Sequence, residues 1–95
     1  MYVAILISKL NSSDLRTAIK PQHDEYWSTR MASLRFAGPM LSDDGSTRIG
    51  QIILLAVDDR NTAEDIVLND PFFKAGLFAD CSIRRFNLSV DNSRP

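Results

Sequence analysis

Two segments of the chain have the pattern of strands that are buried on both faces. Residues 2–8 alternate between two sets of side chains, and both sets are largely apolar. Residues 48–57 form the most hydrophobic stretch, which is unbroken from residue 52 to residue 57. Because a strand that exposes one face usually carries polar side chains there, this pattern indicates burial on both sides. We predict a central strand over the first segment and a second buried strand over the other.

Two further segments predict shorter or less regular strands. Residues 35–40 form a short strand that we expect to stop at Gly38 and Pro39, since proline has no N–H to donate within a sheet. Residues 81–90 close the domain as a strand. The inward-facing positions of this last strand shift phase after residue 83, which predicts a β-bulge near residues 84–85.

The first helical region lies between the first two strands. A short helical turn over residues 15–19 follows a polar break. Proline is favoured at the first position of a helix, where its missing N–H has no partner to lose. We therefore predict a longer helix that begins at Pro21, runs to about Ser33 and buries Trp27 and Met31 on its apolar face.

The second helical region lies before the last strand and ends in an acid. We expect this helix to begin at Asn61, with Glu64 as the capping-box partner three residues later. Pro71 disfavours a helical conformation at Asp70, so the helix is expected to end there. The positions that share its buried face are Ala63, Ile66, Val67 and Asp70. The inward stripe therefore ends in a carboxylate, which is costly to bury without a partner.

The order of elements is strand, helix, strand, strand, helix, strand. It predicts an α+β fold of the ferredoxin-like βαββαβ type, with an antiparallel sheet and both helices on one face. The single domain spans residues 1–90, and residues 91–95 are expected to fray as a tail. The other face of the sheet would expose an apolar patch, so we expect a homodimer with the two sheets face to face. A monomer whose loops cover the sheet is the alternative.

Composition excludes several classes of function. The chain has 95 residues, a net charge of −1 and a single cysteine, so it forms no internal disulfide. Its basic residues form no dense patch, which argues against a nucleic-acid partner. The apolar first strand is too short to span a membrane and lacks the features of a signal peptide, so we expect no membrane partner and a cytoplasmic location. One histidine and one cysteine do not favour a zinc site, and no glycine loop is present to hold phosphate.

The candidate chemistry rests on the only histidine and on the inward acid. His23 would be the third residue of the helix that begins at Pro21, where the helix dipole disfavours an imidazolium. It also shares a stripe with Trp27, which points it towards the sheet. A neutral imidazole can act as a general base, and a carboxylate such as Asp70 can orient it.

Structural readings of the same residues remain open. His23 could cap a helix edge or contact a backbone carbonyl, and Asp70 could end its helix and bind loop amides. Asp24, Asp43 and Asp44 are alternative acids for the histidine, although Asp24 should point away from it on the helix.

The chain resembles the YciI-like (YCII-related) family, whose members are small proteins of the dimeric α+β barrel superfamily. The resemblance covers nearly the whole chain, through an apolar first strand that opens with Tyr2-Val3, then Pro21-x-His23, Ala37-Gly38-Pro39, Asp70-Pro71-Phe72, Ala75-Gly76-Leu77-Phe78 and Ile83-x-x-Phe86. It implies a dimer and a pocket between sheet and helices that contains a histidine–aspartate pair. Some members resemble lyases or isomerases that act on small ring compounds.

These observations predict an enzyme without a cofactor. His23 would be its general acid and base and Asp70 its orienting carboxylate, with a small cyclic or aromatic metabolite as substrate. Elimination, isomerisation and hydrolysis all begin with such a proton transfer. Gly38 and Pro39 are candidates for a pocket wall, and Ser8 is a candidate hydrogen-bond donor to the ligand. The alternative is a non-catalytic dimeric module that binds a small ligand or regulates a partner.

Overall fold

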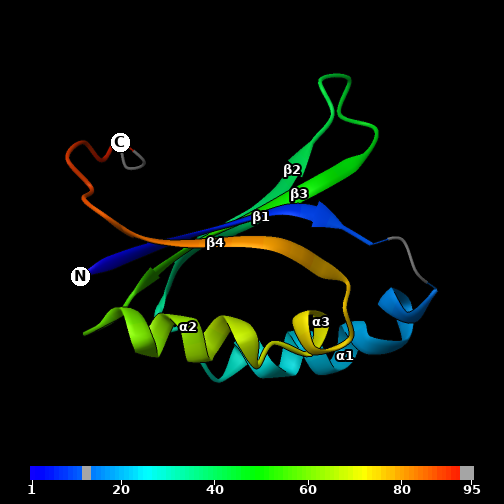
Figure 1. Ribbon diagram of the computed structural model, residues 1–95, viewed down its shortest axis with the longest axis horizontal. Helices are drawn as coiled ribbons and strands as arrows, with labels where there is room; N and C mark the ends of the chain where they lie inside the picture. The colour runs from blue at the N-terminus through cyan, green and yellow to red at the C-terminus, as the bar shows by residue number, and fades with distance from the viewer. Residues whose placement is uncertain (12–13, 93–95) are drawn as a thin grey trace.

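The computed structural model describes residues 1–11 and 14–92 of the chain (Figure 1). Its elements follow the predicted order, with one short helix added before the last strand. They are β1 (Tyr2–Leu10), α1 (Leu15–Ser28), β2 (Leu34–Leu41), β3 (Arg48–Ala56), α2 (Arg60–Leu68), α3 (Pro71–Lys74) and β4 (Phe78–Phe86). Among the described residues, no helix is long and apolar enough to cross a membrane.

The four strands form one antiparallel sheet in the order β2-β3-β1-β4. The two strands that are apolar in both alternating sets, β1 and β3, therefore lie at its centre, as their pattern indicates. All three helices lie against the same face of the sheet (Figure 1). This arrangement confirms the predicted α+β, ferredoxin-like fold.

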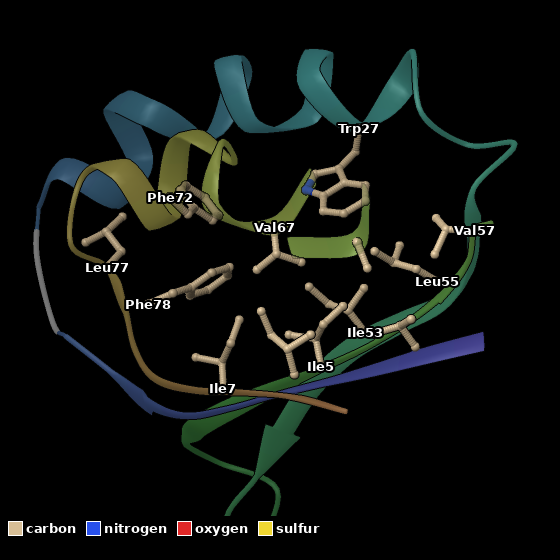
Figure 2. Packing of buried hydrophobic residues seen from close by; sticks show 13 residues of the cluster. Ile5, Ile7, Trp27, Ile53, Leu55, Val57, Val67, Phe72, Leu77 and Phe78 are labelled. Carbon is tan, nitrogen blue, oxygen red and sulfur yellow. The ribbon is translucent and has the colours of Figure 1, made fainter. Parts of the chain in front are cut away.

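The core lies between the sheet and the helices. On the sheet side of this core lie Val3, Ile5 and Ile7 of β1, which have no exposed surface. Figure 2 shows Trp27 entering this core from α1, opposite Ile53 and Leu55 of β3. Burying such side chains stabilises the fold by about 1.5–3 kcal/mol each. The helices are therefore held in place by one continuous apolar layer.

The other face of the sheet carries no helix (Figure 1). Strand alternation places four large apolar side chains on it, each between 40% and 52% exposed in the single chain: Leu6, Phe36, Ile52 and Phe86. The predicted tail begins at Asp91, whose carboxylate pairs with the Arg35 guanidinium at 2.8 Å, and residues 93–95 lie outside the described residues.

The first helix differs from the prediction. The structure has one continuous helix, α1, with Pro21 inside it, and α1 ends at Ser28 rather than near Ser33. Pro21 removes the N–H that would bind the carbonyl of Thr17, but both residues are exposed, so water can satisfy that carbonyl. His23 is consequently the ninth residue of α1 and not the third of a new helix.

The second helical region also differs from the prediction. Helix α2 begins at Arg60 and is capped by Asp59, whose side chain accepts from the Thr62 N–H, so the capping box from Asn61 is wrong. The helix ends at Leu68, before the expected boundary. A further short helix then begins, because Asp70 acts as its N-cap and proline is favoured at its first position.

Two strand boundaries are corrected as well. Strand β2 continues through Gly38 and Pro39 to Leu41, because it lies at the edge of the sheet, where a missing N–H is tolerated. Strand β4 is Phe78–Phe86 rather than 81–90 and keeps a regular register with β1 through residues 84–85, so the predicted bulge is absent. The apparent phase shift arises because Phe86 lies on the open face of the sheet, opposite to Ile83.

Candidate active site

The candidate site is assembled from α1 and from the segment that joins α2 to α3. His23 and Trp27 are four residues apart on α1, so both point from the same face of the helix towards the sheet. Asp70 lies at the start of α3, 47 residues after His23. Packing of α1 against α3 therefore brings the predicted pair of side chains into contact.

Asp70 is held by three hydrogen-bond donors. Its Oδ1 lies 2.8 Å from His23 Nδ1 and also accepts from the Phe72 N–H at 2.8 Å. Its Oδ2 accepts from Trp27 Nε1 at 2.8 Å. The side chain is 1% exposed, and Asp70 is the one charged residue in the buried core of the described chain. These three donors compensate for the burial of the carboxylate.

This arrangement determines which nitrogen of His23 is available. Oδ1 of an ionised carboxylate only accepts, so Nδ1 of the imidazole carries the hydrogen of this bond. In the neutral ring Nε2 is then left with its lone pair, which is the form that a general base needs. His23 lies in the interior of α1 and not in the first turn of a helix, so the predicted effect of the helix dipole in favour of a neutral imidazole does not apply. The contact with Asp70 sets the orientation of the ring.

Aromatic side chains fix the plane of the imidazole. The ring stacks on Phe72 with centroids 4.0 Å apart and an interplanar angle of 13°, and the ring of Phe78 meets it edge-on at 6.4 Å. The guanidinium of Arg16 also lies over the Phe72 ring, 5.1 Å from its centroid. The His23 side chain is 22% exposed, so it is confined on its flanks but still accessible.

His23 opens on a cavity of about 170 Å³ between α1 and the sheet. The residues that line this cavity are His23, Trp27, Leu34, Ala37, Gln51, Ile53 and Phe78. A larger hollow of about 650 Å³ lies on another side of α1 and reaches α3, but it is wide open to solvent and includes neither His23 nor Asp70. We therefore place the candidate site in the smaller cavity, which is lined by His23, while Asp70 lies buried behind the imidazole.

The other candidate residues lie elsewhere. Ser8 donates to the backbone oxygen of Asp80 at 2.9 Å. Gly38 and Pro39 are not among the residues that line the cavity; their neighbour Ala37 is. Of the alternative acids, Asp24 is exposed and pairs with Lys20 at 2.7 Å, and Asp44 binds the hydroxyls of the loop that joins β2 to β3.

Sequence reasoning missed two residues of this site. The sequence predicts Trp27 as a core or interface residue. A buried indole N–H usually needs an acceptor, and that rule was the available signal for its bond to Asp70. Gln51 was not singled out, yet it is the one polar side chain within the apolar stretch from residue 49 to residue 57. An interrupted apolar pattern was the available signal.

Comparison with known proteins places the fold and the family. The sequence profile of the YCII-related domain matches residues 1–87. The structure of the 5-chloro-2-hydroxyhydroquinone dehydrochlorinase TftG from Burkholderia phenoliruptrix AC1100, in complex with 2,5-dihydroxybenzoquinone, is similar. It has a TM-score of 0.74 and 27% identity, over 92% of this chain and 94% of that one.

A second structure shares the fold at low identity. Rv0793 from Mycobacterium tuberculosis has a TM-score of 0.51 and 14% identity, over 99% of this chain and 100% of that one. The curated proteins include no significant match to this chain. Since the family profile covers nearly the whole chain, the protein belongs to the YCII-related domain family.

Proposed function

We propose that the protein is an enzyme that moves a proton on a small cyclic or aromatic metabolite, without a cofactor. His23 is the general acid and base, and Asp70 orients its ring. The observation that carries this proposal is the 2.8 Å contact between His23 Nδ1 and Asp70 Oδ1, made beside a cavity. A carboxylate on one imidazole nitrogen leaves the other nitrogen to exchange a proton with substrate.

The similar dehydrochlorinase supports this class of reaction. Its name describes the removal of hydrogen chloride from a hydroxylated ring, and its structure holds a dihydroxybenzoquinone. Such an elimination combines the loss of a proton with the loss of chloride. A base takes the proton, and the electron pair left on the ring expels the leaving group. In this chain the pair of His23 and Asp70 would supply such a base.

The same proton transfer can be written on the residues of this chain. Nε2 of His23 takes a proton from the substrate, and the electron pair of the broken bond stays on the substrate ring or its carbonyl. The resulting imidazolium remains hydrogen-bonded to the Asp70 carboxylate. Return of the proton to another atom gives an isomer, and departure of a leaving group gives an elimination. General acid–base catalysis of this kind contributes about 10²–10⁴ in rate.

The experiment that tests this proposal does not require the natural substrate. Hydroxylated aromatics, 2,5-dihydroxybenzoquinone and small lactones are incubated with the protein in deuterium oxide, and exchange of substrate C–H for C–D is followed by NMR. We expect the native protein to accelerate exchange on at least one ring compound. His23→Gln, which keeps the approximate size of the side chain, should reduce the acceleration about 10²–10⁴-fold.

A neighbouring acid provides the matched control. Asp24→Asn changes an exposed carboxylate next to His23 in sequence that pairs with Lys20, and it should leave the exchange rate unchanged. The native protein could bind these compounds without exchanging their protons, and this binding could survive His23→Gln and Asp70→Asn. That result would refute the proposed enzymatic function. It would favour the non-catalytic binding module instead.

A further inference from the structure

Gln51 is the one polar side chain that the sheet presents to the cavity. Its neighbour on the same face of β3 is Ile53, which is buried against the helices, so strand alternation directs Gln51 to the helix side as well. The cross-strand partner of Gln51 on β1 is Ile7, which is also buried. The other residues that β2, β3 and β4 contribute to the cavity are apolar.

The Gln51 amide has no partner within the described chain. The side-chain CONH₂ group makes no hydrogen bond to any of the described residues, although this side chain is half-buried. A half-buried amide without a protein partner offers two N–H donors and one acceptor to whatever occupies the cavity. The indole N–H of Trp27 is already used by Asp70. Apart from His23, Gln51 is therefore the side chain of the cavity wall that remains able to hydrogen-bond a ligand.

The size and lining of the cavity restrict the ligand. An apolar cavity of about 150 Å³ can hold benzene, so the volume of about 170 Å³ here fits one ring with small substituents. Leu34, Ile53 and Phe78 supply an apolar wall for the faces and edges of such a ring. Polar recognition is confined to His23 and Gln51, which belong to α1 and to the sheet respectively.

We propose that Gln51 is a substrate-binding and specificity-determining residue, and that the ligand is a single six-membered ring with hydroxyl or carbonyl oxygens. This inference rests on the proposed function for the role of His23. The amide accepts from a ring hydroxyl or donates to a ring carbonyl, while a second substituent or ring C–H meets Nε2 of His23. A neutral amide suits this role because it can pair with both the hydroxyl and the keto form of the ring.

The test measures binding, with Trp27 as the reporter. Trp27 is the only tryptophan of the chain and lines the cavity, so its fluorescence reports on occupancy. Hydroquinone and p-xylene are the two probes, because they have similar shapes and only hydroquinone has hydroxyl groups. We expect Gln51→Leu to weaken hydroquinone binding about tenfold and to change p-xylene binding less than twofold, in line with the loss of one hydrogen bond.

Two further variants separate this role from a structural one. Gln51→Glu keeps an acceptor for a hydroxyl and should restore hydroquinone binding to within a few-fold of the native value. Gln22→Leu makes the same exchange at an exposed glutamine that lines the larger hollow instead of the cavity, and it should alter neither affinity. Circular dichroism confirms that each variant is folded.

Equal effects of Gln51→Leu on hydroquinone and p-xylene, or no effect on either, would overturn the inference. These affinities are measured without turnover, so they are independent of the exchange experiment above. The outcome stated above for the exchange experiment, binding without proton exchange that survives His23→Gln and Asp70→Asn, would refute the proposed acid–base function. A hydroquinone affinity that depends on Gln51 would still establish the binding role.

Discussion

The three donors around Asp70 make Asp70→Asn an informative substitution. An asparagine side chain has one oxygen and one NH₂ group in place of two oxygens. If its oxygen faces His23 and Phe72, its NH₂ opposes the N–H of Trp27. If the amide is rotated, the NH₂ opposes the backbone N–H of Phe72. In either orientation a fixed donor faces another donor in a buried place.

The cost of this conflict follows from the number of unpaired donors. Each buried donor without an acceptor costs about 1–3 kcal/mol, so two facing N–H groups should lower the free energy of unfolding by about 2–6 kcal/mol. Trp27→Phe removes one of the two donors and lets the asparagine oxygen stay towards Phe72. Asp70→Asn should therefore cost about 1–3 kcal/mol less in the Trp27→Phe background than in the native background.

The assay is a double-mutant cycle by urea unfolding. Circular dichroism is the readout, because Trp27→Phe removes the only tryptophan. The loss of core volume in Trp27→Phe is common to both variants that carry it and cancels in the cycle. Asp59→Asn is the matched control, since Asp59 is also an N-cap carboxylate but is exposed, and asparagine caps helices about as well as aspartate.

Additivity would refute this reasoning. If Asp70→Asn lowers the free energy of unfolding equally in both backgrounds, then the bond from Trp27 Nε1 to Asp70 Oδ2 does not contribute to holding the carboxylate. A large loss of stability in Asp59→Asn would show instead that the charge of a capping carboxylate, and not the donor conflict, dominates the effect.

Two other predictions concern acid stability and assembly. Hydrogen bonds from the hydroxyls of Ser42 and Ser46, and from the Ser46 backbone, lower the pKa of Asp44 from 3.8 to about 2. The folded state therefore binds fewer protons than the unfolded state in this range, so the contribution of Asp44 is complete above about pH 4 and is lost as pH falls to about 2. The unfolding free energy of native protein and of Asp44→Ala is measured against pH. The difference between them should shrink as pH falls through that window, and a constant difference would contradict this role of Asp44. We also propose a homodimer through the open face of the sheet. Light scattering should give twice 10.7 kDa for native protein and 10.7 kDa for Leu6→Glu, and a native mass of 10.7 kDa at micromolar concentration would exclude this dimer.

Local rules predicted the helix boundaries less well than the strands. Proline after residue 20 indicated a new helix, but the chain continues in one helix through it, because its exposed side lets water replace the lost bond. Asp70 before Pro71 predicts the end of one helix. The same residue pair instead begins α3, since an N-cap and a proline at the first position favour helix initiation as well.

The amino-acid sequence by itself determined the fold and one half of the site. Apolar residues in both alternating sets of β1 and β3 require a place at the centre of a sheet, and an inward acid such as Asp70 requires a partner. Only the tertiary structure decided which groups meet that acid and which side chains face the cavity. Periodicity reports that a residue is buried, whereas its hydrogen-bond partner depends on how α1 packs against α3 and the sheet. For this reason the bond from Trp27 to Asp70 and the place of Gln51 in the cavity wall follow only from the tertiary structure.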